Sequence, residues 1–318
     1  MLRCALLDDY QDAALSRADF ARLEGRVAFT PFREHIADTA ELLAALAPYD
    51  IVVAMRERTR FDAARLAGLP NLKLLITTGM RNSSIDTAAA TARGITVCGT
   101  ENFSGSAAEM TWALLLALVR HLPREVENLR RGGPWQLTVG RDLSGLRLGI
   151  IGLGTLGSRV ATYGKAFGME VKGWSRSQAM GRADALGIGH APSLQALLAS
   201  SDVLSIHIPL NQETRSLIGA DELALLPPGA ILLNTSRGPI VDEAALIAAL
   251  SSGRLGGAGL DVFDQEPLPL DHAFRSLANV VAAPHLGYVT ENSYQTYFAG
   301  VVEDIEAWLS GQPIRVIA

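Results

Sequence analysis

The sequence has few of the features that mark exported, metal-binding or membrane proteins. It contains only two cysteines, Cys4 and Cys98. Both lie in apolar, strand-like segments without metal-ligand spacing, so we expect buried thiols in a reducing compartment. The longest apolar stretch, near 111–119, is interrupted by Arg120 and His121 and is much shorter than the ~20 residues of a membrane-spanning helix. We therefore expect a soluble, cytoplasmic protein without a metal site or a membrane partner.

Charge is also scarce. Charged residues make up 19% of the 318 positions, the net charge is -5, and no basic stripe is present. Such a surface repels phosphate backbones, so we expect no nucleic-acid partner. Acidic residues at Asp8 and Asp9 come too early for a secretory signal, and the first residues instead predict a strand.

Short β-branched segments alternate with Ala- and Leu-rich helical segments, which predicts βα units and the α/β class. At roughly 150 residues per domain, the length allows two domains. The predicted strands of a first, doubly wound lobe are 3–7, 27–30, 51–54, 74–77 and 96–98, with helices at 39–47 and 84–93. The predicted strands of a second, larger lobe are 146–151, 171–174, 203–206, 230–234, 258–260 and 280–282. We further expect a helix over 101–121, an irregular excursion at 130–135 and a helix over 291–309.

The segment 152–157 reads G-L-G-T-L-G, a G-x-G-x-x-G run that follows an apolar strand and opens a helix. In such a run the first glycine permits a tight turn, the second lets the backbone approach a pyrophosphate, and the third lets the helix pack closely on the strand. The helix N-terminus then offers free N–H groups to the anion. The alternative is a glycine turn with no ligand. The positions expected to contact a dinucleotide are Gly152, Gly154, Thr155, Leu156 and Gly157.

The end of the next strand in such folds usually carries an acidic residue that binds the ribose 2′-hydroxyl. Here that position is Ser175, followed by Arg176 and Ser177, with Arg182 further on. A 2′-phosphate would meet hydrogen-bond donors and positive charge there. This pattern favours NADP as cofactor, with NAD also possible. The alternative is that Arg176 is a solvated loop residue and both cofactors are accepted.

Three later segments accompany the glycine run. They are N-T-S-R-G at 234–238, D-V-F-D-Q-E-P-L at 261–268 and P-H-L-G at 284–287. In this order and spacing the four motifs resemble the D-isomer specific 2-hydroxyacid dehydrogenase family over nearly the whole chain, and within it the glyoxylate/hydroxypyruvate reductases.

The resemblance implies that Arg237 binds the substrate carboxylate and polarises the carbonyl, that His285 is the acid/base, and that Glu266 orients the histidine. The chemistry of hydride transfer to a ketone requires the same groups. Hydride addition to a ketone builds an alkoxide, which needs a proton donor and a fixed cation. A carboxylate beside an imidazole stabilises its charged form. Taken alone, a histidine such as His285 is more commonly a satisfied loop residue.

The resemblance also implies cofactor contacts outside the glycine run, at His207, Pro209, Thr235, Ser236, Asp261 and Gly287. For His207 the alternative is a packed residue at a strand end, and for Asp261 a structural role in a loop. Trp135 resembles an aromatic residue that crosses into the partner subunit of family dimers, or else it caps its own subunit. We therefore expect a homodimer.

On the substrate side, the glycine-rich loop of the family corresponds to 78–86, where this chain departs from the usual pattern. Arg56 lies in a second such segment, as a contact for a carboxylate or phosphate or as a surface residue. Tyr288 stands where the family more often has a small residue. The predicted substrate-binding residues are Arg56, Gly79, Met80, Arg81 and Tyr288.

The resemblance implies a Rossmann NAD(P)-binding domain, 101–285, inserted in a flavodoxin-like substrate domain, 1–100 plus 286–318, both doubly wound parallel sheets. It implies hydride transfer between a nicotinamide and a small D-2-hydroxyacid or 2-keto acid such as glyoxylate or hydroxypyruvate. A formate-type dehydrogenase would carry Gln in place of Glu266, and a phosphoglycerate-type enzyme would need further basic residues near Arg56 and Arg81. A dinucleotide-sensing interaction protein of the corepressor type is the alternative from another class.

Overall fold

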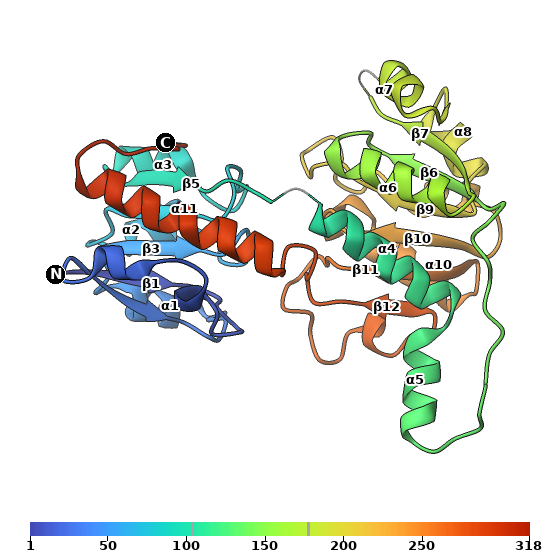
Figure 1. Ribbon diagram of the computed structural model, residues 1–318, viewed down its shortest axis with the longest axis horizontal. Helices are drawn as coiled ribbons and strands as arrows, with labels where there is room; N and C mark the ends of the chain where they lie inside the picture. The colour runs from blue at the N-terminus through green and yellow to red at the C-terminus, as the bar shows by residue number, and fades with distance from the viewer. Residues whose placement is uncertain (104, 177–178) are drawn as a thin grey trace. The chain divides into compact units, whose positions relative to one another are not determined.

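The computed structural model describes residues 1–103, 105–176 and 179–318. The chain divides into two compact units, coloured by residue number in Figure 1. Unit 1 comprises Met1–Phe103 and Thr290–Ala318, and unit 2 comprises Ser104–Val289. Within the described residues, no helix is both long enough and apolar enough to cross a membrane.

Unit 1 is built on a parallel sheet with the strand order β2-β1-β3-β4-β5. Its strands are β1 (Leu2–Leu6), β2 (Val27–Pro31), β3 (Ile51–Ala54), β4 (Leu74–Thr77) and β5 (Thr96–Gly99). Its helices are α1 (Thr39–Leu46), α2 (Ala63–Ala67), α3 (Thr87–Ala92) and α11 (Glu291–Leu309). Every residue of β3 and β4 is buried, as expected for parallel strands that are covered on both faces. This strand order is the flavodoxin-like one.

Local capping explains where the α-helices α1, α2 and α3 of unit 1 begin. Asp38, Asp62 and Asp86 precede α1, α2 and α3, and each side chain accepts a hydrogen bond from the backbone N–H three residues later. An aspartate at this position satisfies one of the N–H groups that the first helical turn leaves without a partner. These short helices therefore start where the sequence supplies a carboxylate.

The end of the chain covers the edge of the unit 1 sheet. Val316 pairs antiparallel with Cys98 of β5, and the N–H of Val97 donates to the carbonyl of Ala318 at 2.7 Å. The Arg315 Nε donates to Asp304 of α11 at 2.9 Å. This pairing occupies backbone groups of β5 that would otherwise form an open sheet edge.

Unit 2 is built on a parallel sheet with the order β12-β11-β10-β9-β6-β7-β8, the Rossmann order extended by one strand. Its strands are β6 (Arg147–Ile151), β7 (Glu170–Trp174), β8 (Gly189–His190), β9 (Val203–Ile206), β10 (Ala230–Asn234), β11 (Leu255–Leu260) and β12 (Val280–Ala282). Its helices are α4 (Ser106–Val119), α5 (Leu122–Arg130), α6 (Thr155–Ala166), α7 (Ala179–Leu186), α8 (Leu194–Ala199), α9 (Ala220–Leu225) and α10 (Glu243–Ser251).

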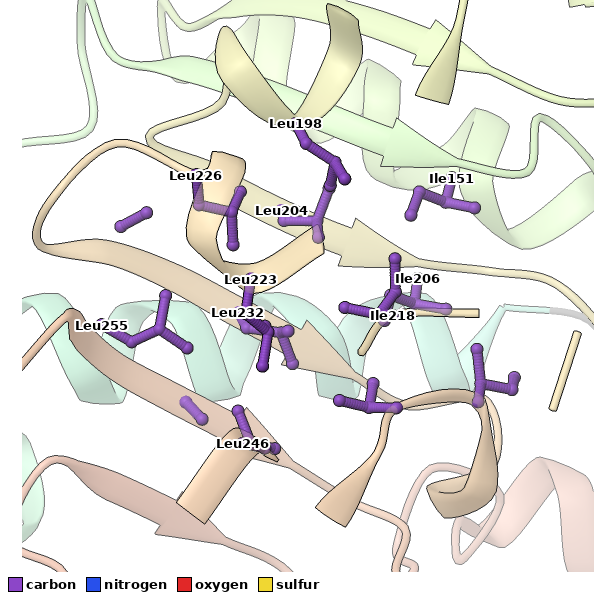
Figure 2. Packing of buried hydrophobic residues seen from close by; sticks show 14 of the residues in the cluster. Ile151, Leu198, Leu204, Ile206, Ile218, Leu223, Leu226, Leu232, Leu246 and Leu255 are labelled. Atoms are coloured by element: carbon purple, nitrogen blue, oxygen red, sulfur yellow. The ribbon is translucent and has the colours of Figure 1, made fainter. Parts of the chain in front are cut away.

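Two apolar layers cover this sheet. Figure 2 shows the first, in which Leu198 of α8, Leu223 of α9 and Leu246 of α10 belong to one buried cluster with Leu204 and Leu232 of the strands. The second contains buried residues of α4 and α6 together with those of β6. Burial on both faces explains the continuous apolar runs by which these strands were predicted.

The predicted parallel α/β architecture is confirmed, and the predicted strands are all present, with ends that differ by up to three residues. The sequence did not predict β8, because a strand of two residues is too short to show an apolar run or an alternating pattern. The helix expected over 101–121 is shorter, Ser106–Val119, and α5 follows at once. His121 adopts a left-handed conformation between them, and Pro123 lies in the first turn of α5, where its missing N–H breaks no helical hydrogen bond.

Candidate active site

The glycine run forms a cradle between β6 and α6. A Cβ on Gly152 would lie 2.4 Å from the carbonyl oxygen of His207, and one on Gly157 would lie 1.9 Å from that of Gly152. The fold therefore requires both glycines. A Cβ on Gly154 would meet no described atom within 4 Å, and no described side chain caps α6 there. This open N-terminus, with N–H groups to donate, fits the phosphates of a dinucleotide.

A hollow of about 430 Å³ lies beside this cradle and is lined by Gly154, Thr155, Ser158 and Arg182, among others. The Arg182 guanidinium donates to the carbonyl of Leu153 at 3.2 Å, which holds the cation at the glycine run. A positive side chain and a helix N-terminus on the same hollow both favour an anion.

The end of β7 carries an ion pair. Arg176 binds the Glu213 carboxylate through one guanidinium nitrogen and donates to the Glu213 carbonyl oxygen through the other at 2.8 Å. Arg176 is therefore held by a loop that follows β9 rather than being only solvated. Ser177, which the sequence also indicated as a cofactor contact, lies outside the described residues.

His207 follows β9 on the same edge. Its Nε2 lies 2.7 Å from the Ser205 hydroxyl, and its buried Nδ1 has no hydrogen-bond partner within the described part of the chain. Burial lowers the pKa of His207 to about 4, so the ring is neutral near pH 7. Pro209 is exposed two residues later. A neutral imidazole with an orphaned buried nitrogen is compatible with a polar cofactor group beside it.

Three neighbouring strand ends carry the predicted catalytic residues. Arg237, Glu266 and His285 follow β10, β11 and β12 in the chain, and these strands are adjacent and parallel. The carboxyl ends of parallel strands meet at one edge of the sheet, where ligands of such folds bind.

A short hydrogen-bonded contact joins His285 and Glu266. The His285 Nδ1 lies 2.6 Å from Oε2 of Glu266, while Oε1 accepts the N–H of Phe263 at 2.9 Å. The carboxylate is thus fixed by its own loop and in turn orients the imidazole. This arrangement leaves Nε2 as the ring nitrogen that can exchange a proton with a substrate.

Arg237 is positioned through its backbone. The buried Asn234 side chain donates to the Arg237 carbonyl at 2.9 Å and accepts the Ser236 N–H at 3.0 Å. A Cβ on Gly238 would lie 2.1 Å from the carbonyl carbon of Phe263. The turn that carries Arg237 therefore packs directly against the loop that leads to Glu266.

Asp261 fixes the chain after His285. Its two carboxylate oxygens accept the N–H groups of Leu286 and Gly287, each at 2.7 Å. Burial raises the pKa of Asp261 to about 6. The structural loop role is therefore present in the geometry, while contact with a nicotinamide stays a prediction.

Other predicted residues are held by neighbouring elements. The Thr235 hydroxyl lies 2.7 Å from that of Thr111 in α4, and the Ser236 hydroxyl donates to the Ile206 carbonyl at 2.7 Å. Tyr288 is buried, and its ring packs edge-on against His285 with centroids 5.1 Å apart. Tyr288 thereby narrows the space on that side of the imidazole.

The remaining predicted substrate residues belong to unit 1. Arg56 donates through Nη1 to the carbonyl of Thr78 and to Asn102 Oδ1, each at 3.0 Å. It lies against Gly79, where a Cβ would be 2.0 Å from this nitrogen. Arg56 and Gly79 are thus brought together, and Arg56 is half-buried rather than a simple surface residue, whereas Met80 and Arg81 are exposed.

The Rossmann sheet, its glycine cradle and a carboxylate-backed histidine define the class of a dinucleotide-dependent oxidoreductase. Residues 112–287 match the family model of the D-isomer specific 2-hydroxyacid dehydrogenase, NAD binding domain. The chain belongs to the D-isomer specific 2-hydroxyacid dehydrogenase family, as an NAD-dependent oxidoreductase acting between a hydroxyacid and its keto acid.

Individual relatives carry related names. The chain is 40% identical to a glyoxylate reductase of Aeropyrum pernix over 263 residues, which cover 80% of this chain and 78% of that protein. It is 35% identical to a D-3-phosphoglycerate dehydrogenase of Methanocaldococcus jannaschii over 86% of this chain but only 52% of that protein. A solved phosphoglycerate oxidoreductase from Vibrio cholerae O395 is 36% identical, with a TM-score of 0.93 over 98% of this chain and 100% of that chain.

The structure adds three residues that the sequence did not single out for a role. They are Thr111, Glu213 and Gly238, which contact Thr235, Arg176 and the Phe263 backbone. Gly238 had a readable signal, since it closes the N-T-S-R-G motif. No sequence motif marked Thr111 or Glu213, because the residues that they contact are distant in the chain.

Proposed function

We propose that this enzyme acts on a small 2-keto acid such as glyoxylate or hydroxypyruvate, in the reducing direction, with Arg237, Glu266 and His285 as its catalytic set. The observation that carries the proposal is the 2.6 Å contact between Glu266 and His285 on the strand edge that also carries Arg237. The names of relatives such as the glyoxylate reductase of Thermococcus litoralis, 36% identical, support the substrate class.

In this proposal each residue acts on the substrate at a stated atom. Arg237 binds the carboxylate and polarises the carbonyl, which favours negative charge on the carbonyl oxygen. His285 gives the proton from Nε2 to that oxygen as it becomes a hydroxyl, and Glu266 orients the ring through Nδ1. When bound, the nicotinamide cofactor supplies the hydride.

Initial rates with glyoxylate, hydroxypyruvate and a panel of larger 2-keto acids, each with NADH and NADPH, test this function. We expect the highest kcat/KM for the two small substrates. Binding of NADPH without reduction of any 2-keto acid would contradict the proposal and favour a sensing role. A preference for phosphorylated substrates would contradict the substrate class alone.

For the cofactor, we propose that NADP is preferred and NAD is also accepted. Ser175 offers no carboxylate to repel a 2′-phosphate, and Arg176 and Arg182 bring positive charge to the neighbourhood of the cradle. The predicted contacts along the cradle and the strand ends, from Gly152 to Gly287, belong to this proposal. Dissociation constants for the two oxidised cofactors measure the preference directly.

We propose that unit 1 supplies the substrate-binding residues Arg56, Gly79, Met80 and Arg81, and that unit 2 supplies the dinucleotide site and the further substrate contact Tyr288. Support comes from the Arg56 guanidinium beside Gly79, which combines a cation with a glycine loop on which a carboxylate can be received. Met80, Arg81 and Tyr288 complete the proposed contacts. An increased KM for the keto acid in Arg56→Gln, with cofactor affinity retained, would support the assignment, and an unchanged KM would contradict it.

We propose that the protein is a homodimer formed through α5. In Figure 1 α5 extends away from the sheet of its unit, and none of its residues is buried. Leu122, Val126 and Leu129 expose 44–60% of their surface, and Trp135 exposes 81%. A hollow of about 440 Å³, lined by residues of α4, β11 and β12 among others, offers an apolar surface for a second copy.

Light scattering tests this assembly. The wild-type protein should have the mass of two chains, and Leu129→Glu should shift it towards one chain, because a buried charge opposes an apolar interface. A monomeric wild type would contradict the proposal.

We propose a cytoplasmic location. Cys4 and Cys98 are buried and free, and burial raises the pKa of Cys98 to about 12, so this thiol stays protonated and unreactive. Imaging of a tagged protein tests the location.

A further inference from the structure

The loops after β7 and β9 of unit 2 lie at the edge of the sheet where the adenosine half of a dinucleotide would bind. The strand order β9-β6-β7 places β6, with its glycine cradle, between two neighbours. The helices that follow β6 and β9, α6 and α9, belong to the two different apolar layers of the sheet, and nucleotides bind at such a switch point. The loops after β7 and β9 therefore flank the path of the adenosine.

Arg176 and Glu213 connect these two loops. Arg176 follows β7 and Glu213 follows β9, and they are joined by an ion pair and by a hydrogen bond of 2.8 Å to the Glu213 carbonyl. The two residues are 37 positions apart in the chain. The pair therefore spans the carboxyl edge of β6, where the cradle lies.

The backbone of Glu213 is held in place by its neighbours. The Asn211 side chain accepts the N–H groups of Glu213 and Thr214 at 2.9 and 3.0 Å, and the Thr214 hydroxyl donates to the Pro209 carbonyl at 2.8 Å. An Asx turn of this kind fixes the local backbone. The carboxylate of Glu213 is thus presented to Arg176 by a defined turn.

We propose that Glu213 is a specificity-determining residue that limits the preference for NADP over NAD, an inference that rests on the proposed cofactor preference. A 2′-phosphate competes with the Glu213 carboxylate for the Arg176 guanidinium, so NADP binding breaks the Arg176–Glu213 ion pair. A ribose 2′-hydroxyl carries no charge and leaves the pair intact. Glu213 therefore weakens NADP binding selectively and keeps NAD usable.

The alternative is an ordinary surface ion pair. The Arg176 and Glu213 side chains are 43% and 75% exposed, and such pairs contribute little to folding stability. Removing the carboxylate should therefore leave the melting temperature unchanged. The two interpretations differ in the cofactor affinities, which only the specificity role changes.

The experiment measures dissociation constants by calorimetry for NADP⁺, NAD⁺ and adenosine 2′,5′-bisphosphate. We expect Glu213→Gln to tighten NADP⁺ and the bisphosphate by about fivefold, the scale of one exposed charge interaction, and to leave NAD⁺ nearly unchanged. The matched control is Glu170→Gln, which removes the same charge at the exposed start of β7. An unchanged affinity ratio, or an equal change in the control, would overturn the inference.

A double-mutant cycle tests the route through Arg176. In the Arg176→Gln background, Glu213→Gln should have a much smaller effect on NADP⁺ affinity, because the competition for the guanidinium is gone. An undiminished effect would overturn the proposed role. The wild-type affinity ratio separately tests the NADP preference, so failure of that preference is distinguishable from failure of the Glu213 role.

Discussion

The Nδ1 atom of His285 lies 2.6 Å from the Oε2 atom of Glu266, although the two residues follow different strands of the sheet. The second oxygen of Glu266 accepts the Phe263 N–H, so the carboxylate cannot turn away without losing a hydrogen bond. The histidine is therefore oriented from one side by an anchored anion. Asp261 fixes the backbone that follows His285, because its carboxylate accepts the N–H groups of Leu286 and Gly287.

Replacement of His285 by alanine should reduce kcat by about a thousandfold, within the usual contribution of a general acid. Cofactor affinity should change by less than about twofold, because the cradle around 152–157 does not involve His285. Steady-state rates and calorimetric titration with NADP⁺ measure both effects. An active variant with normal kcat would remove His285 from the chemistry.

Replacement of Glu266 by glutamine should reduce kcat by at least about tenfold, because the amide keeps the shape but not the charge that stabilises the imidazolium. The matched control is Glu243→Gln. Glu243 pairs with His272 at 3.0 Å elsewhere in unit 2, and its replacement should leave kcat near the wild-type value. Equal effects of the two variants would show that loss of any such pair disturbs the unit.

The glycines of the cradle should separate binding from folding. Gly154→Ala places a methyl group where no described atom lies within 4 Å, so the melting temperature should stay unchanged. Cofactor affinity should fall by about tenfold or more, because the methyl group prevents a phosphate from approaching the backbone. Gly157→Ala should instead lower the melting temperature, because its Cβ would lie 1.9 Å from the Gly152 carbonyl. Thermal melts and titrations distinguish the two. Similar behaviour of both variants would contradict the proposed cradle.

Asp304 should make the stability of unit 1 depend on pH. It is fully buried against Arg315, and burial raises its pKa from 3.8 to about 7. Because the folded pKa lies above the unfolded one, the contribution of this group to stability is complete below about pH 4 and is lost as the pH rises towards 7.

Asp304→Asn removes this titration, so its stability relative to wild type should improve as the pH rises from about 4 to about 7. Chemical denaturation at several pH values measures the difference. The exposed Asp271 offers a control, as Asp271→Asn. Parallel curves for wild type and Asp304→Asn would contradict the prediction.

Much of the fold could be predicted because its signals are local. The strands Ile51–Ala54, Val203–Ile206 and Ala230–Asn234 appear in the sequence as short apolar runs, since both faces of a parallel sheet are covered. The glycine run could be interpreted for the same reason, because turn, helix start and strand are contiguous. The start of α5 could not be predicted, because a proline such as Pro123 is compatible both with the end of one helix and with the first turn of the next.

The candidate site likewise has features that are local in the sequence and features that depend on contacts between distant segments. The sequence by itself determined which residues stand at the carboxyl ends of strands, because chain order and strand length are local properties. The family resemblance implied the contact of Glu266 with His285. Only the tertiary structure decided the others: Arg176 with Glu213, Thr111 with Thr235, and the C-terminal Val316 with Cys98. Those contacts depend on the order in which strands lie side by side, and that order comes from packing between segments that no local period relates.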